Sequence, residues 1–303
     1  MTSGGPLFTR AMALADGITD WQLRGPSYQR LFTGVYAPSD LPITAALLAR
    51  GALLAAPPGS LAARHTAAEL WRGIVPDQPD VHLAIPPSTR MQVAGIDARA
   101  RAGTSSTRRD GILLTTPADT FVDLAADLTL VDLVVLGDSL VRRGLLAPRE
   151  LVAAAELAHG RAVRSARRAA RLVRLGVDSA METRLRLLLV LAGLPEPVVN
   201  HVIRDEVGNW LFRLDLAYPE VKVAIEYDGR QHAESRRQWV KDVGRREWFD
   251  GDGWRIVTVL SGDLYHRPDL TLDRVVGVLQ ARGIRTRIRG VEWQRHFPVR
   301  RGA

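Results

Sequence analysis

The chain has 303 residues and a net charge of +8, with 46% hydrophobic and 24% charged residues. This composition is typical of a folded soluble protein, and the length predicts two or three compact units. The absence of cysteine excludes disulfide scaffolds, cysteine-ligated zinc and thiol nucleophiles, so any metal ion must be held by carboxylates or histidine.

The ends and the charge of the chain indicate its location and partners. No apolar run reaches the roughly 18 residues that a bilayer requires, and the N-terminus lacks the pattern of a secretory signal. We therefore expect a cytoplasmic protein without a membrane partner. The isoelectric point near 10.6 favours a polyanion such as DNA, because each phosphate contact releases counterions. Charge alone is a weak argument, since many basic proteins bind nothing specific.

Residues 1–41 predict a short helix, a turn, a second helix over 18–32 and an extended segment. Thr9 can cap the first helix, Gly17 can end it, and Gly34 allows a turn into a wing strand. The order suits a winged helix-turn-helix, although a plain three-helix cap would have the same periodicity.

Residues 42–150 mix Ala/Leu-rich helices with short strands at 81–85 and 111–115 and predict an α/β domain. His65 and His82 stand alone among apolar neighbours, which is more typical of core histidines than of metal ligands. We find no catalytic constellation in this part of the chain.

Residues 151–177 predict a basic helical linker. Six arginines between residues 161 and 174 fall on about 140° of a helix, opposite Ala, Val and Leu. A solvated face and a phosphate-binding face fit this pattern equally well. The candidate DNA contacts among them are Arg164, Arg168 and Arg171.

Two strands joined by a tight turn at 218–220 are predicted within the next domain, residues 178–281. Alternation places Glu226 and Asp228 on one face of the second strand, and antiparallel pairing brings Asp215 beside them. Three crowded carboxylates repel one another and raise their pKa values unless a cation lies between them.

A divalent ion held by Asp215, Glu226 and Asp228 would relieve this repulsion. Mg²⁺ or Mn²⁺ takes oxygen ligands, keeps several waters and can bridge a phosphate, as phosphodiester hydrolysis requires. His232 could act as a general acid or base. The alternative is an exposed hairpin face in which Lys222 and Arg213 neutralise these acids.

The flanking helices contribute further candidates. Ser179 and Glu182 open the first helix with the spacing of a capping box, which is also compatible with a catalytic role for Glu182. Asp242, Arg245 and Arg246 lie on a later predicted helix, where Asp242 and Arg246 could form a surface ion pair. These three residues are candidate DNA contacts.

The basic tail, residues 282–303, has seven arginines interleaved with Trp293 and Phe297. A flexible arm that adds nonspecific affinity and plain disorder are equally compatible with it.

About 85 residues of the chain resemble the uncharacterised domain family related to the very-short-patch-repair endonucleases, within the restriction-endonuclease-like, or PD-(D/E)xK, superfamily. The resemblance implies an αβββαβ core in which Asp215 is the principal metal carboxylate and Glu182 lies on the first helix. Two departures put catalysis in doubt, because Asp228 replaces the classical lysine and no proline precedes Asp215. The matching residues are Ser179, Glu182, Leu185, Arg186, 214–217, 225–229, His232, Asp242, Arg245, Gly253 and Trp254.

The front half has three short motifs, at 34–36, 64–68 and 115–124. In these motifs it is similar to AbiEi-family antitoxins and transcriptional regulators of type IV toxin–antitoxin systems. It implies a winged helix joined to an α/β domain.

Together these patterns predict an α/β (α+β) protein that binds DNA and hydrolyses it with Mg²⁺ or Mn²⁺. The rival hypothesis is a non-catalytic antitoxin-like repressor whose nuclease fold serves DNA binding or dimerisation. A cognate toxin or a second copy of the chain are the possible protein partners.

Overall fold

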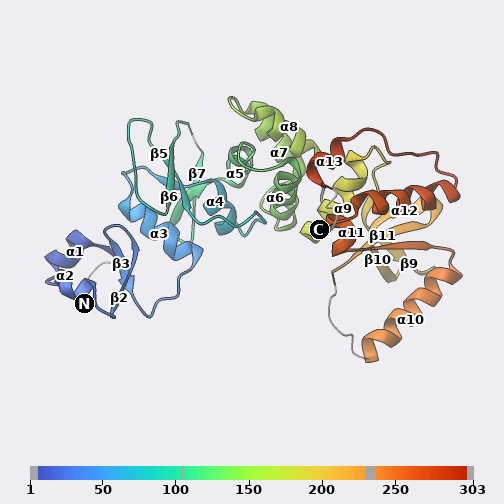
Figure 1. Ribbon diagram of the computed structural model, residues 1–303, viewed down its shortest axis with the longest axis horizontal. Coiled ribbons are helices and arrows are strands. Elements are labelled where there is room, and N and C mark those ends of the chain that lie inside the picture. The colour runs from blue at the N-terminus through green and yellow to red at the C-terminus, as the bar shows by residue number, and fades with distance from the viewer. Residues whose placement is uncertain (1–5, 104, 230–235, 299–303) are drawn as a thin grey trace. The chain divides into compact units, whose positions relative to one another are not determined.

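The computed structural model describes residues 6–103, 105–229 and 236–298, and only the backbone of 236–243. The chain forms two compact units, Met1–Val173 and Arg174–Ala303. Each unit combines helices with β-sheets (Figure 1), so the predicted mixed α+β class is confirmed. No helix in the described ranges is long and apolar enough to span a bilayer.

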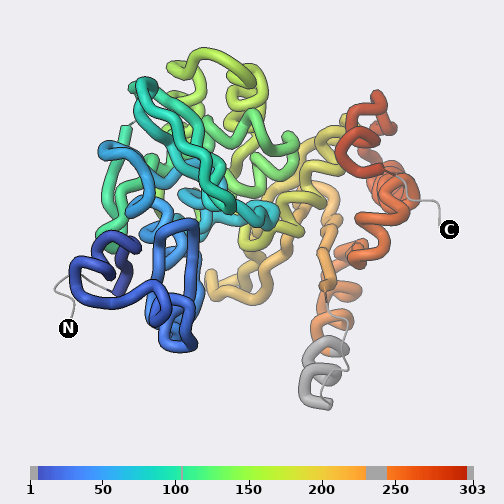
Figure 2. The backbone as a smooth tube through the Cα atoms, turned by 60° about the vertical axis from the view of Figure 1, so that its left-hand side comes forward, coloured from blue at the N-terminus to red at the C-terminus, as the bar shows by residue number. Residues whose placement is uncertain are grey.

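The first unit begins with two short helices and a small antiparallel sheet, whose β2–β3 hairpin is drawn in blue in Figure 2. Thr9 caps the first helix by accepting a hydrogen bond from the amide of Met12. Gly17 and Gly34 have φ of +82° and +78°, so both turns need the left-handed conformation that glycine adopts readily. The predicted helix cap and the two predicted glycine turns are confirmed. The elements are β1 (Phe8–Thr9), α1 (Arg10–Ala15), α2 (Asp20–Leu23), β2 (Tyr28–Phe32) and β3 (Val35–Pro38), in the sheet order β1-β3-β2.

The predicted second helix over 18–32 is wrong in its length. It begins with a capping box between Thr19 and Gln22 and ends at Leu23. Pro26 has no amide hydrogen to continue the helix, and the next residues form strand β2. The apolar side chains that suggested a longer helix belong to a half-buried strand.

The rest of the first unit is a five-stranded mixed sheet with helices. The sheet has the order β6-β5-β4-β8-β7. Helix α6 is buried along most of its length and contacts α5, α7 and α8. The elements are α3 (Ala45–Ala55), β4 (Leu61–Ala62), α4 (Arg64–Leu70), β5 (Val81–Ile85), β6 (Ile96–Ala100), β7 (Ser106–Arg109), β8 (Ile112–Thr115), α5 (Pro117–Leu124), α6 (Leu130–Arg142), α7 (Pro148–Leu157) and α8 (Val163–Leu172).

The arginine-rich helix is α8, and it belongs to the packed part of the first unit. Ala166, Ala169 and Ala170 are buried, and the helix contacts α6 and α7. The boundary between the two units falls directly after Val173, inside the segment that the sequence predicted as a linker.

The second unit has the element order α9, β9, β10, β11, α10, β12, followed by three more helices. Its sheet has the order β12-β11-β10-β9, with β11 and β12 parallel and the other pairs antiparallel. Helix α12 lies beside the sheet in contact with β11 and β12 (Figure 1). The elements are α9 (Ala180–Leu191), β9 (Val198–Arg204), β10 (Trp210–Tyr218), β11 (Val223–Asp228), α10 (Arg236–Gly251), β12 (Arg255–Leu260), α11 (Ser261–Tyr265), α12 (Pro268–Ala281) and α13 (Glu292–His296).

The described part of the predicted basic tail is packed against the second unit. Trp293 and Phe297 are each 4% exposed, and α13 contacts α9. Burying two aromatic side chains stabilises this arrangement by roughly 1.5–3 kcal/mol each. Up to Pro298 the segment is therefore an integral part of the unit, and the prediction of a flexible or disordered arm is wrong there.

Candidate functional site

The candidate site of the second unit lies where strands β10 and β11 separate. Their ladder includes Leu216 paired with Ile225, but Asp215 is no longer in it. Instead, the backbone amide of Tyr227 donates a 3.0 Å hydrogen bond to Oδ2 of Asp215. The carboxylate of Asp215 therefore lies against the backbone of β11 just past the last ladder pair. It is beside the segment that carries Glu226 and Asp228, as the hairpin predicted.

Glu182 lies at the start of α9 with 8% of its surface exposed. Ser179 caps the helix by accepting from the amide of Glu182 at 3.1 Å. The Glu182 carboxylate accepts from the backbone amide of Asp178 at 2.9 Å. A capping box would use the amide of Ser179, the next residue. The Asn200 amide also donates to it, at 3.4 Å. Sequence analysis missed Asp178 and Asn200.

Burial controls the charge of these two acids. It is the main cause that raises the pKa of Asp215 above its usual value, while the Tyr227 amide, Arg245 and Arg213 oppose it. Burial likewise raises the pKa of Glu182, and the nearby charge of Asp215 raises it further. Glu182 and Asp215 are thus close enough to repel each other, and an added cation would favour the ionised form of both.

Arg245 supplies positive charge at this site. Its guanidinium forms an ion pair with Glu226 and lies over the Phe249 ring, 5.3 Å from the ring centroid. Glu226 and Asp228 belong to one continuous strand and so share a face, as predicted. Helix α10 thereby supplies a positive charge to Glu226.

The two expected partners of the hairpin acids form ion pairs with other carboxylates. Lys222 pairs with Asp252 at 3.1 Å, and Arg213 pairs with Asp178 at 2.5 Å. This argues against a simple exposed hairpin face on which Lys222 and Arg213 neutralise Glu226 and Asp228.

The structure does not place every predicted site residue. His232 lies outside the described residues, as does the side chain of Asp242, whose backbone is part of α10. Arg246 is exposed on the same helix. Across the described ranges, no three Asp, Glu or His side chains gather closely enough to enclose a metal ion.

The acids present at the site are nevertheless of a type that binds hard divalent cations. Glu182, Asp215 and Glu226 offer carboxylate oxygens, the ligands that Mg²⁺ and Mn²⁺ prefer. Glu182 and Asp215 are desolvated, and the charge of Asp215 raises the pKa of Glu182. Glu226 forms an ion pair with Arg245. A metal ion would hold Glu182 and Asp215 directly and would compete with Arg245 for Glu226.

The predicted arginine contacts of α8 are partly occupied by protein groups. Arg171 pairs with Glu156 at 2.8 Å, and Arg167 donates to backbone carbonyls at the end of α7. Arg164 and Arg168 are exposed. The helix therefore uses part of its charge to pack against α7.

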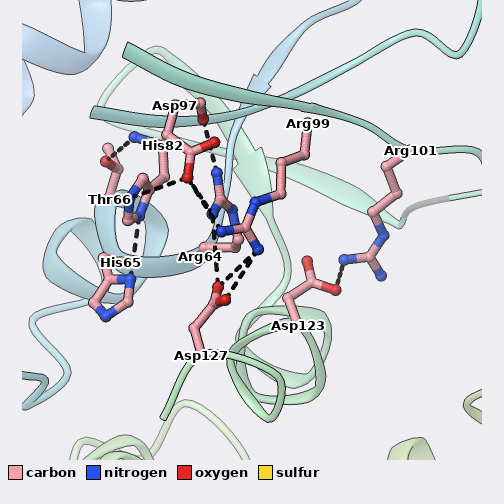
Figure 3. A network of polar contacts seen from close by, with 9 residues as sticks. All are labelled: Arg64, His65, Thr66, His82, Asp97, Arg99, Arg101, Asp123 and Asp127. Carbon is pink, nitrogen blue, oxygen red and sulfur yellow. Dashed lines mark hydrogen bonds and ion pairs between the residues drawn. The ribbon is translucent and has the colours of Figure 1, made fainter. Parts of the chain in front are cut away.

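A second polar cluster lies in the first unit (Figure 3). His65 and His82, predicted to stand alone, contact each other through their Nδ1 atoms at 3.1 Å. The buried Arg64 pairs with Asp97 at 2.8 Å, and Asp127 lies 3.6 Å from the same guanidinium. The two histidines are core residues, as predicted, but belong to a charged network that sequence spacing did not reveal.

This network predicts acid sensitivity of the first unit. Burial, the largest cause, and the charge of Arg64 lower the pKa of His82 to about 4, and burial also lowers that of His65. The unfolded chain then binds protons between pH 6.5 and about 4 that folded His82 does not, so stability falls as pH falls through this window. The loss from His82 is roughly 3 kcal/mol at pH 4.

Urea unfolding at pH 7 and pH 4.5 checks this. We expect His82→Gln to reduce the loss of unfolding free energy between pH 7 and pH 4.5. His159→Gln, at an exposed position of the same unit, should leave this loss unchanged. If both variants lost the same unfolding free energy between the two pH values, His82 would not be the cause of the acid sensitivity.

Comparison with known proteins gives relatives without an assigned role. No model of a known protein family matches the chain. Two uncharacterized proteins of Mycobacterium tuberculosis, from strains CDC 1551 and H37Rv, are each 27% identical over 258 residues, which is 84% of this chain and 94% of the relative. Since the first unit has only 173 residues, the match extends into both units.

Proposed function

We propose that this is a DNA-binding protein whose second unit is a metal-dependent endonuclease domain. The observation that carries the proposal is the pair of desolvated, mutually repelling carboxylates of Glu182 and Asp215 at the point where β10 and β11 separate. Such a pair is stabilised by a divalent cation. The element order of the unit, α9 through β12, agrees with the αβββαβ core that the restriction-endonuclease-like resemblance implies.

The residues have distinct proposed roles. Bound Mg²⁺ or Mn²⁺ supplies an activated water and offsets charge on the phosphate. Asp215 and Glu182 would hold the ion, Glu226 would join them if Arg245 released it, and Asp228 would assist from the end of β11. Arg245 would bind a DNA phosphate through its planar guanidinium when it is not paired with Glu226. His232 is the proposed proton carrier.

The first unit is the proposed targeting element. Its two short helices and β2–β3 hairpin support a winged helix-turn-helix, and the exposed Arg164 and Arg168 of α8 are candidate phosphate contacts. The AbiEi-like resemblance of this half supports the same role.

One observation favours a second candidate function. The Arg245–Glu226 ion pair already places a cation in the acidic site, and Asp228 stands where the classical lysine is expected. In the alternative, the protein is an antitoxin-like repressor in which this site is a permanent structural ion pair and the domain only binds DNA or dimerises.

Metal-dependent thermal stability separates the two functions. If Mn²⁺ binds the native site, it raises the unfolding temperature of the wild type. Arg245→Gln removes the guanidinium that pairs with Glu226 and would compete with the ion, so we expect a larger Mn²⁺-dependent rise in this variant. Arg246→Gln removes the same charge from an exposed neighbour on α10 and should respond like the wild type. No response in any of the three proteins would reject the metal site and favour the repressor.

A further inference from the structure

A short segment joins α12 to α13 (Figure 1). Its sequence has arginine at every second position from 285 to 289. Residues 284–289 belong to no helix or strand. Their burial alternates as in an extended chain. The outward side chains are Arg285, Arg287 and Arg289, and the inward ones are Ile284, Thr286 and Ile288.

Backbone contacts fix this segment in place. The amide of Ile284 donates to the carbonyl of Leu279 at 2.9 Å, and the amide of Arg289 donates to the carbonyl of Ala192 at 2.7 Å. In between, the side chain of Gln280 donates to the carbonyl of Thr286 at 2.8 Å. The row is therefore held from both ends and in the middle, which reduces the entropy lost when a ligand binds.

The segment is held closely against the end of α9. Gly193, just past that helix, has φ of +80°, and a Cβ there would lie 2.9 Å from the Cβ of Arg289. Glycine is thus needed both for the backbone conformation and for the close approach of the segment.

The three arginines line an open groove with a volume of about 720 Å³. Gln280, Gly283, Ile284 and Thr286 form the rest of its lining. Within the part of the chain that the structure describes, no carboxylate forms an ion pair with Arg285, Arg287 or Arg289. The groove is therefore a concentration of positive charge that the surrounding described residues leave unneutralised.

The spacing of the charges indicates the type of ligand. An extended chain advances about 3.3 Å per residue, so alternate side chains follow one another at about 6.6 Å along a line. A linear array of this kind suits a polymer with regularly repeated phosphates better than a single anion, which a converging cluster would hold more tightly. The neighbouring aromatic side chains, Trp293 and Phe297, are buried and cannot stack on bases.

We propose that Arg285, Arg287 and Arg289 form a binding site for the phosphate backbone of DNA, without base recognition. The choice of DNA as the polyanion rests on the proposed function, but the site is separate from the acidic residues and does not depend on cleavage. It gives the second unit its own affinity for DNA, with a strong dependence on salt concentration.

The test measures the salt dependence of DNA binding by the full chain in EDTA, where cleavage cannot occur. A labelled duplex and a labelled single strand of the same sequence are titrated at several salt concentrations. The variant Arg285→Gln/Arg287→Gln removes two phosphate contacts. We expect the slope of log K against log salt to become shallower by about 1.8 for the duplex or about 1.4 for the single strand.

A matched control has the same net charge as the groove variant, because it also loses two arginines. Arg267→Gln/Arg274→Gln removes two exposed arginines that already pair with Asp263, and its slope should change by less than about 0.5. Equal slope changes in both double variants, or none in the groove variant, would overturn the proposal. Because no divalent ion is present, a protein that fails to nick DNA can still pass this test, and a nuclease can still fail it.

Discussion

Asp215→Asn is expected to lower the Mn²⁺-dependent rate of nicking of supercoiled DNA by on the order of 100-fold or more. Substitution of groups that merely orient metal ligands costs about 10- to 100-fold, and Asp215 is a proposed direct ligand. The change keeps the size of the side chain, and its carboxamide oxygen can still accept from the Tyr227 amide. The fold should therefore survive while the charge that holds the cation is lost.

Glu220→Gln is the matched control, because it removes one negative charge from an exposed position at the turn of the same hairpin. We expect its nicking rate to stay within about twofold of the wild type, since exposed charges several residues away act only weakly through solvent. Equal nicking by the wild type and Asp215→Asn, or none by the wild type, would contradict metal catalysis at this site.

Arg186→Ala should have the largest effect on the stability of the second unit, a loss of about 3 kcal/mol in the free energy of unfolding. The Arg186 side chain is fully buried and pairs with Glu196 at 3.3 Å. Truncation leaves a cavity inside the unit and removes one of the charges that face Glu196. Glu196 is itself 35% exposed and still pairs with Arg174 in the variant. The expected loss is therefore at the lower end of the roughly 3–5 kcal/mol that breaking a buried ion pair costs.

Arg174→Ala provides the comparison, because Arg174 pairs with the same carboxylate at 2.8 Å but is 35% exposed. A partly exposed pair of this kind contributes about 1 kcal/mol or less. Urea unfolding monitored by tryptophan fluorescence gives both values. If the two variants lost equal stability, burial of Arg186 would not be the cause.

Local features of the fold could be predicted because they depend on neighbouring residues. The helix cap at Thr9, the turn at Gly34 and the hairpin from Trp210 to Asp228 follow from side-chain hydrogen bonding, glycine conformation and alternation. The juxtaposition of Asp215 with the second hairpin strand followed from the same alternation. For the candidate site, sequence analysis therefore placed Asp215 beside the strand that carries Glu226 and Asp228.

Features that depend on tertiary packing were not predictable in this way. The contact between His65 and His82 joins α4 to β5, and the ion pair between Arg245 and Glu226 joins α10 to β11. Nothing in the spacing of these residues indicates that they meet. The difference at Tyr28–Phe32 has another cause, since a short apolar run fits either a strand or a helix, and Pro26 ends the helix before it.

The central claim, that a divalent cation belongs among Glu182, Asp215 and Glu226, is tested most directly by a crystal structure of the protein grown with Mn²⁺. We predict an anomalous density peak about 2.1 Å from carboxylate oxygens of Asp215 and Glu182, with Arg245 displaced from Glu226. An ordered site without a peak, in which Arg245 still pairs with Glu226 at saturating Mn²⁺, would contradict it.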